Sequence, residues 1–294
     1  MSRKLENLYI NLNGEFFLAN APVLHATNRA FRYGDSVFES IRIINREPVF
    51  INEHFERLKN SMHILGFEAS AQFTYRHLAE QMAALIERNN IKEGGRIRLT
   101  VFRNDGGYYT PDTNQKSYLI ECTPLSENLY TLNQAGYHID LYTKIKKHQN
   151  IYASLKTGNA LMYVMAAKYK KEAKLDECVI LNQNDRICEA ISSNIFLYKS
   201  GSLYTPALSE GCLDGIMRLK VIELAKQLNI RIIEEAFTPT NLLQADEVFL
   251  TNAVSGIRWV ISYKQKRYFN TFSKKIVEEL NKQVIEKVSS ETKF

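Results

Sequence analysis

A polar break at Thr123-Pro124-Leu125-Ser126-Glu127-Asn128 constrains the fold of this chain more than any other stretch. Proline and clustered polar residues interrupt strand and helix patterns alike, so we expect a linker there. The 294 residues also exceed what a single hydrophobic core usually holds. The sequence therefore predicts an N-terminal domain at 1–122, a linker at 123–135 and a C-terminal domain at 136–294.

Both halves mix strand and helix patterns. In the first half we expect hairpins around Asn13-Gly14 and Asn45-Arg46-Glu47, the second joining 41–44 to 48–51. Apolar spacing predicts the other elements of that half: helices at 53–65 and 75–90, and strands at 96–102 and 118–122. The same reasoning gives, for the second half, helices at 159–174, 216–229 and 272–288 and strands at 137–142, 178–182, 187–189, 194–198, 203–205, 231–236 and 247–251. Because strands and helices do not alternate strictly, we expect two α+β domains.

Composition excludes several classes of protein. Hydrophobic residues make up 45% and charged residues 24%, and no stretch reaches the roughly 18 apolar residues of a membrane helix. The N-terminal Met1–Glu6 has no apolar signal core behind it, so we expect a cytoplasmic protein. The four cysteines, none in a C-x-x-C pair, are expected to be free core residues without a metal: Cys122, Cys178, Cys188 and Cys212.

The net charge of +6 suits either nucleic acid or anionic small molecules. The basic residues are scattered, however, and no nucleic-acid-binding motif accompanies them. The two densest clusters, Lys144-Ile145-Lys146-Lys147 and Lys264-Gln265-Lys266-Arg267, are interpreted as solvated loops. We therefore expect a small-molecule substrate and neither nucleic acid nor a membrane as partner.

A lysine and a glutamate stand out in the second half. Lys156 lies at the start of a predicted helix, in Ser154-Leu155-Lys156-Thr157-Gly158-Asn159, and Glu189 precedes a predicted strand. Pyridoxal 5'-phosphate (PLP) needs an amine for a Schiff base and a carboxylate beside its pyridine nitrogen. The pair therefore favours a PLP site, provided that the chain also supplies groups for the phosphate.

Three stretches could bind that phosphate. The glycine turn Gly211–Gly215 opens the helix at 216–229, and helix N-termini bind phosphate through unpaired N–H groups. A polar turn at 250–256 could add further N–H groups, and Arg57 on an early helix offers a permanent cation. Taken alone, the glycine turn is more often an ordinary helix start and Arg57 a solvated arginine, and the polar turn could be a plain loop.

Taken together, these motifs resemble the fold-type IV PLP enzymes, which include branched-chain and D-amino acid aminotransferases and 4-amino-4-deoxychorismate lyases. The resemblance runs from Arg29-Ala30-Phe31-Arg32-Tyr33-Gly34-Asp35-Ser36-Val37-Phe38-Glu39 to the turn after Thr251. It implies a small, sandwich-like N-terminal domain and a larger C-terminal pseudo-barrel domain. It also implies a homodimer.

The resemblance assigns roles to particular residues. Lys156 would hold PLP as an internal aldimine and act as acid and base, and Glu189 would pair with the pyridine nitrogen. Arg57, in His54-Phe55-Glu56-Arg57-Leu58, would bind the phosphate. Backbone groups would complete the phosphate site, at Ile216, Met217, Asn252 and Ala253.

Three local features bear on the reaction. Leu161 stands where branched-chain aminotransferases usually carry a tyrosine, Arg103 opens an R-x-x-G-G-x-Y loop similar to that of the lyases, and the turn after Thr251 has the lyase-like T-N-x form. These features favour 4-amino-4-deoxychorismate lyase, which releases pyruvate and leaves 4-aminobenzoate for folate synthesis. Arg103 and Arg42 would then bind substrate carboxylates.

Alternatives remain open beside the lyase. Ser40 could relay a proton or be an ordinary strand residue. The enzyme could instead be an aminotransferase for branched-chain or D-amino acids, with the same Lys156 and Glu189. A binding module that retains an enzyme's fold is a third, non-catalytic reading.

Overall fold

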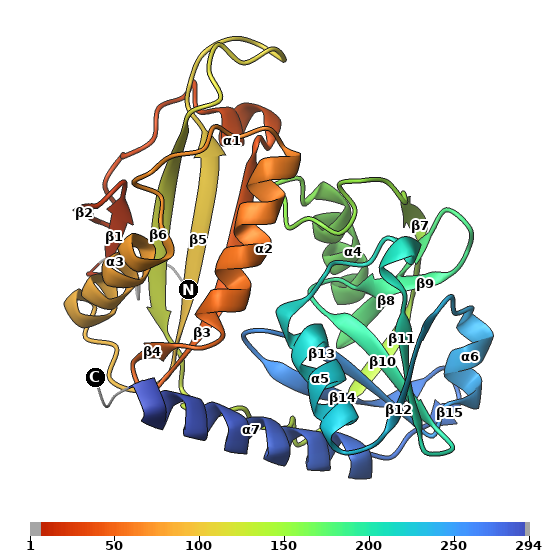
Figure 1. Cartoon of the computed structure of the whole chain (residues 1–294). Coiled ribbons are helices and arrows are strands. Elements are labelled where there is room, and N and C mark those ends of the chain that lie inside the picture. Colours follow the sequence, from red (N-terminus) through yellow and green to blue (C-terminus); the bar gives the residue numbers. More distant parts are fainter. Residues whose placement is uncertain (1–6, 292–294) are drawn as a thin grey trace. The chain divides into compact units, whose positions relative to one another are not determined.

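The computed structural model in Figure 1 describes residues 7–291. The chain forms two compact units, each described here by itself. The first contains the described residues up to Leu129 together with the segment Lys156–Asn159, and the second contains Tyr130–Leu155 and Ala160–Ser289. The segment that carries Lys156 thus belongs with the first unit, although the sequence analysis placed it in the domain at 136–294.

An antiparallel sheet forms the first unit, in the strand order β2-β1-β6-β5-β3-β4. Its elements are β1 (Tyr9–Leu12), β2 (Glu15–Leu18), α1 (Arg29–Tyr33), β3 (Ser36–Ile44), β4 (Glu47–Pro48), α2 (Ile51–Ile64), α3 (Tyr75–Arg88), β5 (Gly95–Arg103) and β6 (Lys116–Pro124). Helices α2 and α3 pack on one face of this sheet (Figure 1). The hairpin at Asn13-Gly14 is confirmed, with Leu12 paired to Glu15.

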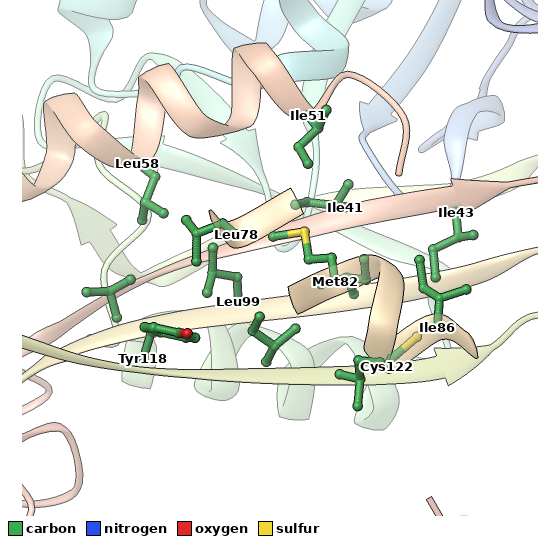
Figure 2. Packing of buried hydrophobic residues seen from close by; sticks show 14 of the residues in the cluster. Ile41, Ile43, Ile51, Leu58, Leu78, Met82, Ile86, Leu99, Tyr118 and Cys122 are labelled. Atoms are coloured by element: carbon green, nitrogen blue, oxygen red, sulfur yellow. The ribbon is translucent and has the colours of Figure 1, made fainter. Parts of the chain in front are cut away.

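Figure 2 shows the core between this sheet and its two helices. Alternate residues of β3 and β5, such as Ile41 and Leu99, point toward Leu58 of α2 and Met82 of α3 (Figure 2). Because side chains alternate across a strand, the intervening residues of β3 and β5 face the opposite side of the sheet. That opposite face carries Phe38, Ser40, Arg42, Arg96 and Arg98.

A mixed sheet forms the second unit, in the order β12-β11-β10-β13-β14-β7-β8-β9 with β15 beside β14. Its strands are β7 (Tyr137–Lys147), β8 (Glu177–Asn182), β9 (Ile187–Ala190), β10 (Asn194–Lys199), β11 (Ser202–Pro206), β12 (Arg231–Glu235), β13 (Glu247–Asn252), β14 (Gly256–Tyr263) and β15 (Lys266–Arg267). Its helices are α4 (Leu161–Glu172), η2 (Leu208–Glu210), α5 (Ile216–Gln227), α6 (Pro239–Gln244) and α7 (Thr271–Glu291). Since β9 also contacts β10, the sheet curls into a half-barrel. The α+β prediction is therefore confirmed.

Several predicted limits were wrong. Residues 49–51 are not a strand, because α2 already begins at Ile51, and β7 continues to Lys147 instead of ending at Tyr142. The sequence analysis also missed β14, the partner of both β13 and β7. In the described part of the chain, no helix is long and apolar enough to cross a membrane.

Candidate active site

The segment that carries Lys156 lies along the start of β3. Phe38 donates its backbone N–H to the Lys156 carbonyl at 2.9 Å, and the Gly158 N–H donates to the Ser36 carbonyl at 2.9 Å. A Cβ on Gly158 would come within 2.3 Å of the Ser36 hydroxyl, so only glycine permits this close approach. The local sequence thus fixes the backbone of Lys156 in the first unit.

The Lys156 amine lies above an aromatic ring on the sheet face that the helices leave uncovered. Its Nζ is 4.4 Å from the centre of the Phe38 ring, and the Arg98 guanidinium carbon is 3.8 Å from the same centre. Arg96 Nη2 lies 3.4 Å from the Ser40 hydroxyl on the same face. Cation–π contacts of this kind favour a positive group close to the ring. The amine therefore shares this face with two arginines.

The structure separates the three residues expected to bind substrate. Ser40 lies on the face with Lys156, in register with Arg98. Arg42 lies on that face too, but it is buried and its Nη2 donates to the carbonyls of Glu127 and Leu129.

Arg103 lies elsewhere, in an internal network. Its guanidinium donates to Asp35 at 3.0 Å, to Asn114 at 2.5 Å and to the carbonyls of Leu65 and Gly66 at 2.8 and 3.4 Å. The side chain is buried, and its donors hold two loops against β5. Most Arg103 donors are thus engaged within its own unit, which argues against the contact with a substrate carboxylate that the sequence analysis expected.

Arg57 is held by a carboxylate on β3. Its Nε and Nη2 donate to the two oxygens of Glu39 at 2.8 and 2.5 Å. The Arg57 side chain retains 10% of its exposure. The guanidinium is therefore fixed in orientation, as a residue that recognises a phosphate should be.

In the second unit, three donors surround the Glu189 carboxylate. Lys147 Nζ and the Tyr163 hydroxyl donate to Oε1, each at 2.6 Å, and the Leu213 N–H donates to Oε2 at 2.7 Å. Glu189 is almost fully buried. A carboxylate can accept about four hydrogen bonds, so one acceptor position remains on Oε2.

Both side-chain partners of Glu189 were missed in the sequence. Burial disfavours the charge of Lys147, but Glu189 and Tyr163 outweigh burial and raise the pKa of Lys147 well above its ordinary value. Burial and Glu189 raise the pKa of Tyr163 as well, so it stays a neutral donor. The interpretation of Lys144–Lys147 as a solvated loop is thus wrong for Lys147, which ends the extended strand β7 with its side chain 11% exposed.

Tyr163 also changes how Leu161 bears on the choice between lyase and aminotransferase. The Leu161 side chain is 74% exposed at the first position of α4. The phenol that this helix contributes comes from Tyr163, two residues further on. The absence of a tyrosine at position 161 therefore carries less weight against an aminotransferase than the sequence suggested.

The start of α5 provides a candidate phosphate site. Gly215 is the N-cap and Ile216 and Met217 are the first helical residues, and no side chain of the described chain caps this end. A Cβ on Gly215 would lie 2.0 Å from the Asn194 amide oxygen, so glycine is required for this packing. The uncapped N–H groups and the positive end of the helix dipole suit a phosphate.

The turn after β13 lies beside that helix start. Thr251 pairs directly with Asn194 across β10 and β13, so both side chains project from the same face of the sheet. Within residues 7–291, the buried Thr251 hydroxyl oxygen has no hydrogen-bond partner. Such an orphaned group normally finds a partner, and a phosphate oxygen is a suitable one.

The two loop residues named in the sequence analysis shape this turn. The Asn252 amide oxygen accepts the N–H groups of Val254 at 3.1 Å and Ser255 at 2.7 Å. The Ala253 carbonyl accepts the Tyr130 hydroxyl at 2.9 Å. The Asn252 side chain is therefore occupied in holding the loop, and any contact with an anion falls to backbone groups and to Thr251.

Each unit offers groups that suit part of PLP. The chain offers a lysine amine, a buried carboxylate with one remaining acceptor position, an oriented arginine and an uncapped helix start beside an orphaned hydroxyl. These groups match an aldehyde, a pyridine nitrogen and a phosphate in turn. No group of three or more metal-ligating side chains is found in the described part of the chain.

Comparison with known proteins gives a consistent family. The model of the family "Amino-transferase class IV" matches residues 36–263. The aminodeoxychorismate lyase of Bacillus subtilis (strain 168) is 27% identical over 261 residues, which cover 84% of this chain and 84% of that protein. The branched-chain-amino-acid aminotransferase of Salmonella typhimurium is 30% identical over 263 residues, with coverages of 85% and 82%. Among solved structures, the branched-chain aminotransferase of Thermoproteus uzoniensis has a TM-score of 0.86, 25% identity and 95% coverage of both chains.

Replacing Lys147 tests the environment of Glu189. Lys147→Met leaves a buried carboxylate without its cation and should reduce the free energy of unfolding by about 3–5 kcal/mol. Lys146→Met is the matched control, because Lys146 pairs with the exposed Asp185, and it should cost at most about 1 kcal/mol. Urea unfolding of both variants provides the measurement. Equal effects of the two substitutions would contradict the account of Glu189.

Proposed function

We propose that this chain, which belongs to the class IV aminotransferase family, is a 4-amino-4-deoxychorismate lyase that releases pyruvate and 4-aminobenzoate. It is a PLP-dependent enzyme. The homodimer implied by the family resemblance is part of this proposal.

The proposal assigns each half of the cofactor to particular residues. Lys156 would carry the covalent link, and Glu189 would hold the protonated pyridine nitrogen. Arg57, the N–H groups of Ile216 and Met217, and the turn at Asn252-Ala253 bind the phosphate. We add the Thr251 hydroxyl to this set because it is buried without a partner among the described residues.

The observation that carries the lyase over the aminotransferase is the cationic face around Lys156. Arg98 stacks on the ring that lies below the Lys156 amine and is 3.8 Å from Glu121 Oε2, and Arg96 reaches Ser40 on the same face. Arg96 Nε is buried and has no hydrogen-bond partner in the described chain. A substrate with two carboxylates, such as aminodeoxychorismate, suits two arginines better than a branched-chain amino acid does. In this proposal Arg96 and Arg98 take the role expected of Arg103, and Arg42 pairs with Arg96 across β3 and β5.

The chemistry requires few protein groups. When bound, PLP supplies an electron sink for the carbon that carries the substrate amine. Lys156 Nζ would serve as the base that removes the proton from that ring carbon, and would return a proton to the departing enolpyruvate. Ser40, whose hydroxyl is 3.4 Å from Arg96 Nη2, is a second candidate to relay the proton to enolpyruvate. Pyruvate and 4-aminobenzoate together contain every atom of the substrate, so no water or oxidant is consumed.

The second candidate is an aminotransferase for branched-chain or D-amino acids. The 30% identity with the Salmonella enzyme supports it, as does the Tyr163 phenol beside Glu189. It would use the same Lys156 and Glu189 but return the amine to a 2-oxo acid. A cationic face gives a branched side chain no favourable contact. For that reason we place the aminotransferase second.

One incubation separates the two activities. Purified holoenzyme is mixed with aminodeoxychorismate, and pyruvate is followed with lactate dehydrogenase. The lyase proposal predicts pyruvate and 4-aminobenzoate in equal amounts. No pyruvate, together with conversion of the cofactor to its pyridoxamine form by leucine or D-alanine, would refute it in favour of the aminotransferase.

Arg98→Gln tests the cationic face. Loss of a charged hydrogen bond to a substrate carboxylate should raise KM for aminodeoxychorismate about 10- to 100-fold. PLP absorbance should not change, since Arg98 is not assigned to the cofactor. Arg76→Gln, an exposed arginine of α3 paired with Glu80, is the control and should leave KM as it is. A KM unchanged in Arg98→Gln would remove Arg98 from the substrate site.

A further inference from the structure

Glu39 occupies one particular edge of the Arg57 guanidinium. The planar group has two edges that can form paired hydrogen bonds, one of Nε with Nη2 and one of Nη1 with Nη2. Glu39 accepts from Nε at 2.8 Å and from Nη2 at 2.5 Å, so it takes the first edge. The second edge shares Nη2 with the first and points in another direction within the same plane.

Glu39 itself is held from a second side. His54 Nδ1 lies 2.6 Å from Glu39 Oε2, and both side chains are buried, with 1% and 2% exposure. Burial would raise the pKa of Glu39, but Arg57 and His54 outweigh it and lower this pKa to about 2. Burial lowers the pKa of His54, so a neutral imidazole donating from Nδ1 fits the contact. The carboxylate is thus charged at neutral pH and fixed in direction by two residues of α2.

We propose that Glu39, oriented by His54, is a positioning residue for the cofactor phosphate, because it fixes the direction in which the Nη1–Nη2 edge of the Arg57 guanidinium points. This inference rests on the assignment of Arg57 to the phosphate in the proposed function. Glu39 touches neither the cofactor nor the substrate in this scheme. Its effect is to remove the rotational freedom that a lone arginine would lose on binding.

The geometry distinguishes this role from a simple structural ion pair. An ion pair that only stabilises α2 against β3 would affect every ligand of the first unit alike. A positioning role for Arg57 affects only ligands that carry the phosphate. Pyridoxal, the same aldehyde without phosphate, therefore provides the comparison.

The experiment titrates apoprotein with PLP and separately with pyridoxal, following the absorbance of the covalent product with Lys156. Glu39→Gln keeps the size of the side chain but removes its charge and one acceptor oxygen. We expect it to lower the affinity for PLP on the order of tenfold and to change the affinity for pyridoxal less than about twofold. A decrease of this size is typical when residues that orient metal ligands are removed. Glu56→Gln is the matched control; Glu56 lies next to Arg57 on α2 with a 70% exposed side chain, and the substitution should change neither affinity.

Further variants separate the possible failures. Arg57→Gln should lower the affinity for PLP more than the affinity for pyridoxal. Adding Glu39→Gln to it should have little further effect, because the two residues act through one contact. If Arg57→Gln leaves the ratio of PLP affinity to pyridoxal affinity unchanged, Arg57 does not bind the phosphate, and this inference is refuted as well. If Arg57→Gln lowers that ratio while Glu39→Gln does not, only the role of Glu39 is refuted. Glu39→Asp keeps the charge and should lower this affinity ratio less than Glu39→Gln. An equal decrease in the affinities for PLP and pyridoxal in either Glu39 variant would also overturn the inference.

Discussion

Residues 156–158 lie along the first residues of β3, and this contact fixes where the Lys156 amine can reach. Two backbone hydrogen bonds and the close packing of Gly158 on Ser36 hold the segment. The amine consequently lies over Phe38, on the sheet face that α2 and α3 leave uncovered. Every group that we assign to the substrate is on that face because β3 and β5 alternate their side chains across the sheet.

Two buried carboxylates organise the remaining site residues, one in each unit. Glu39 is held by Arg57 and His54, and Glu189 by Lys147 and Tyr163. An isolated buried charge is very costly, so each carboxylate needs its cation and its hydrogen bonds. The same partners that offset this cost also fix the direction of the groups proposed to contact the cofactor. Stability and positioning thus depend on the same contacts.

Much of the fold could be predicted from apolar spacing, as the core helix α7 illustrates. Its predicted repeat, Ile276, Leu280, Val284 and Val288, is buried throughout. The end of β7 could not be found in this way, because Lys144–Lys147 has no apolar alternation and a charge run is usually solvated. Only the tertiary position of Glu189 explains why Lys147 is buried.

The candidate site was only partly accessible from the sequence for a similar reason. Motifs pointed to Lys156, Glu189 and Arg57, but a motif cannot tell which arginines share a sheet face with Lys156. Arg103 is turned inward by Asp35 and Asn114, whereas Arg98 is turned toward Phe38. The alternation R-x-R at 96–98 has β-strand spacing. It was the one signal that could have indicated that Arg96 and Arg98 lie on the same sheet face.

The most direct test of the central claim is to locate the covalently bound cofactor. Holoenzyme is reduced with borohydride, digested with trypsin and mapped by mass spectrometry. We predict that the phosphopyridoxyl mass is found on a peptide spanning 148–168, with cleavage blocked at Lys156. Modification of Lys147, whose amine contacts Glu189, or of any lysine other than Lys156, would contradict the account.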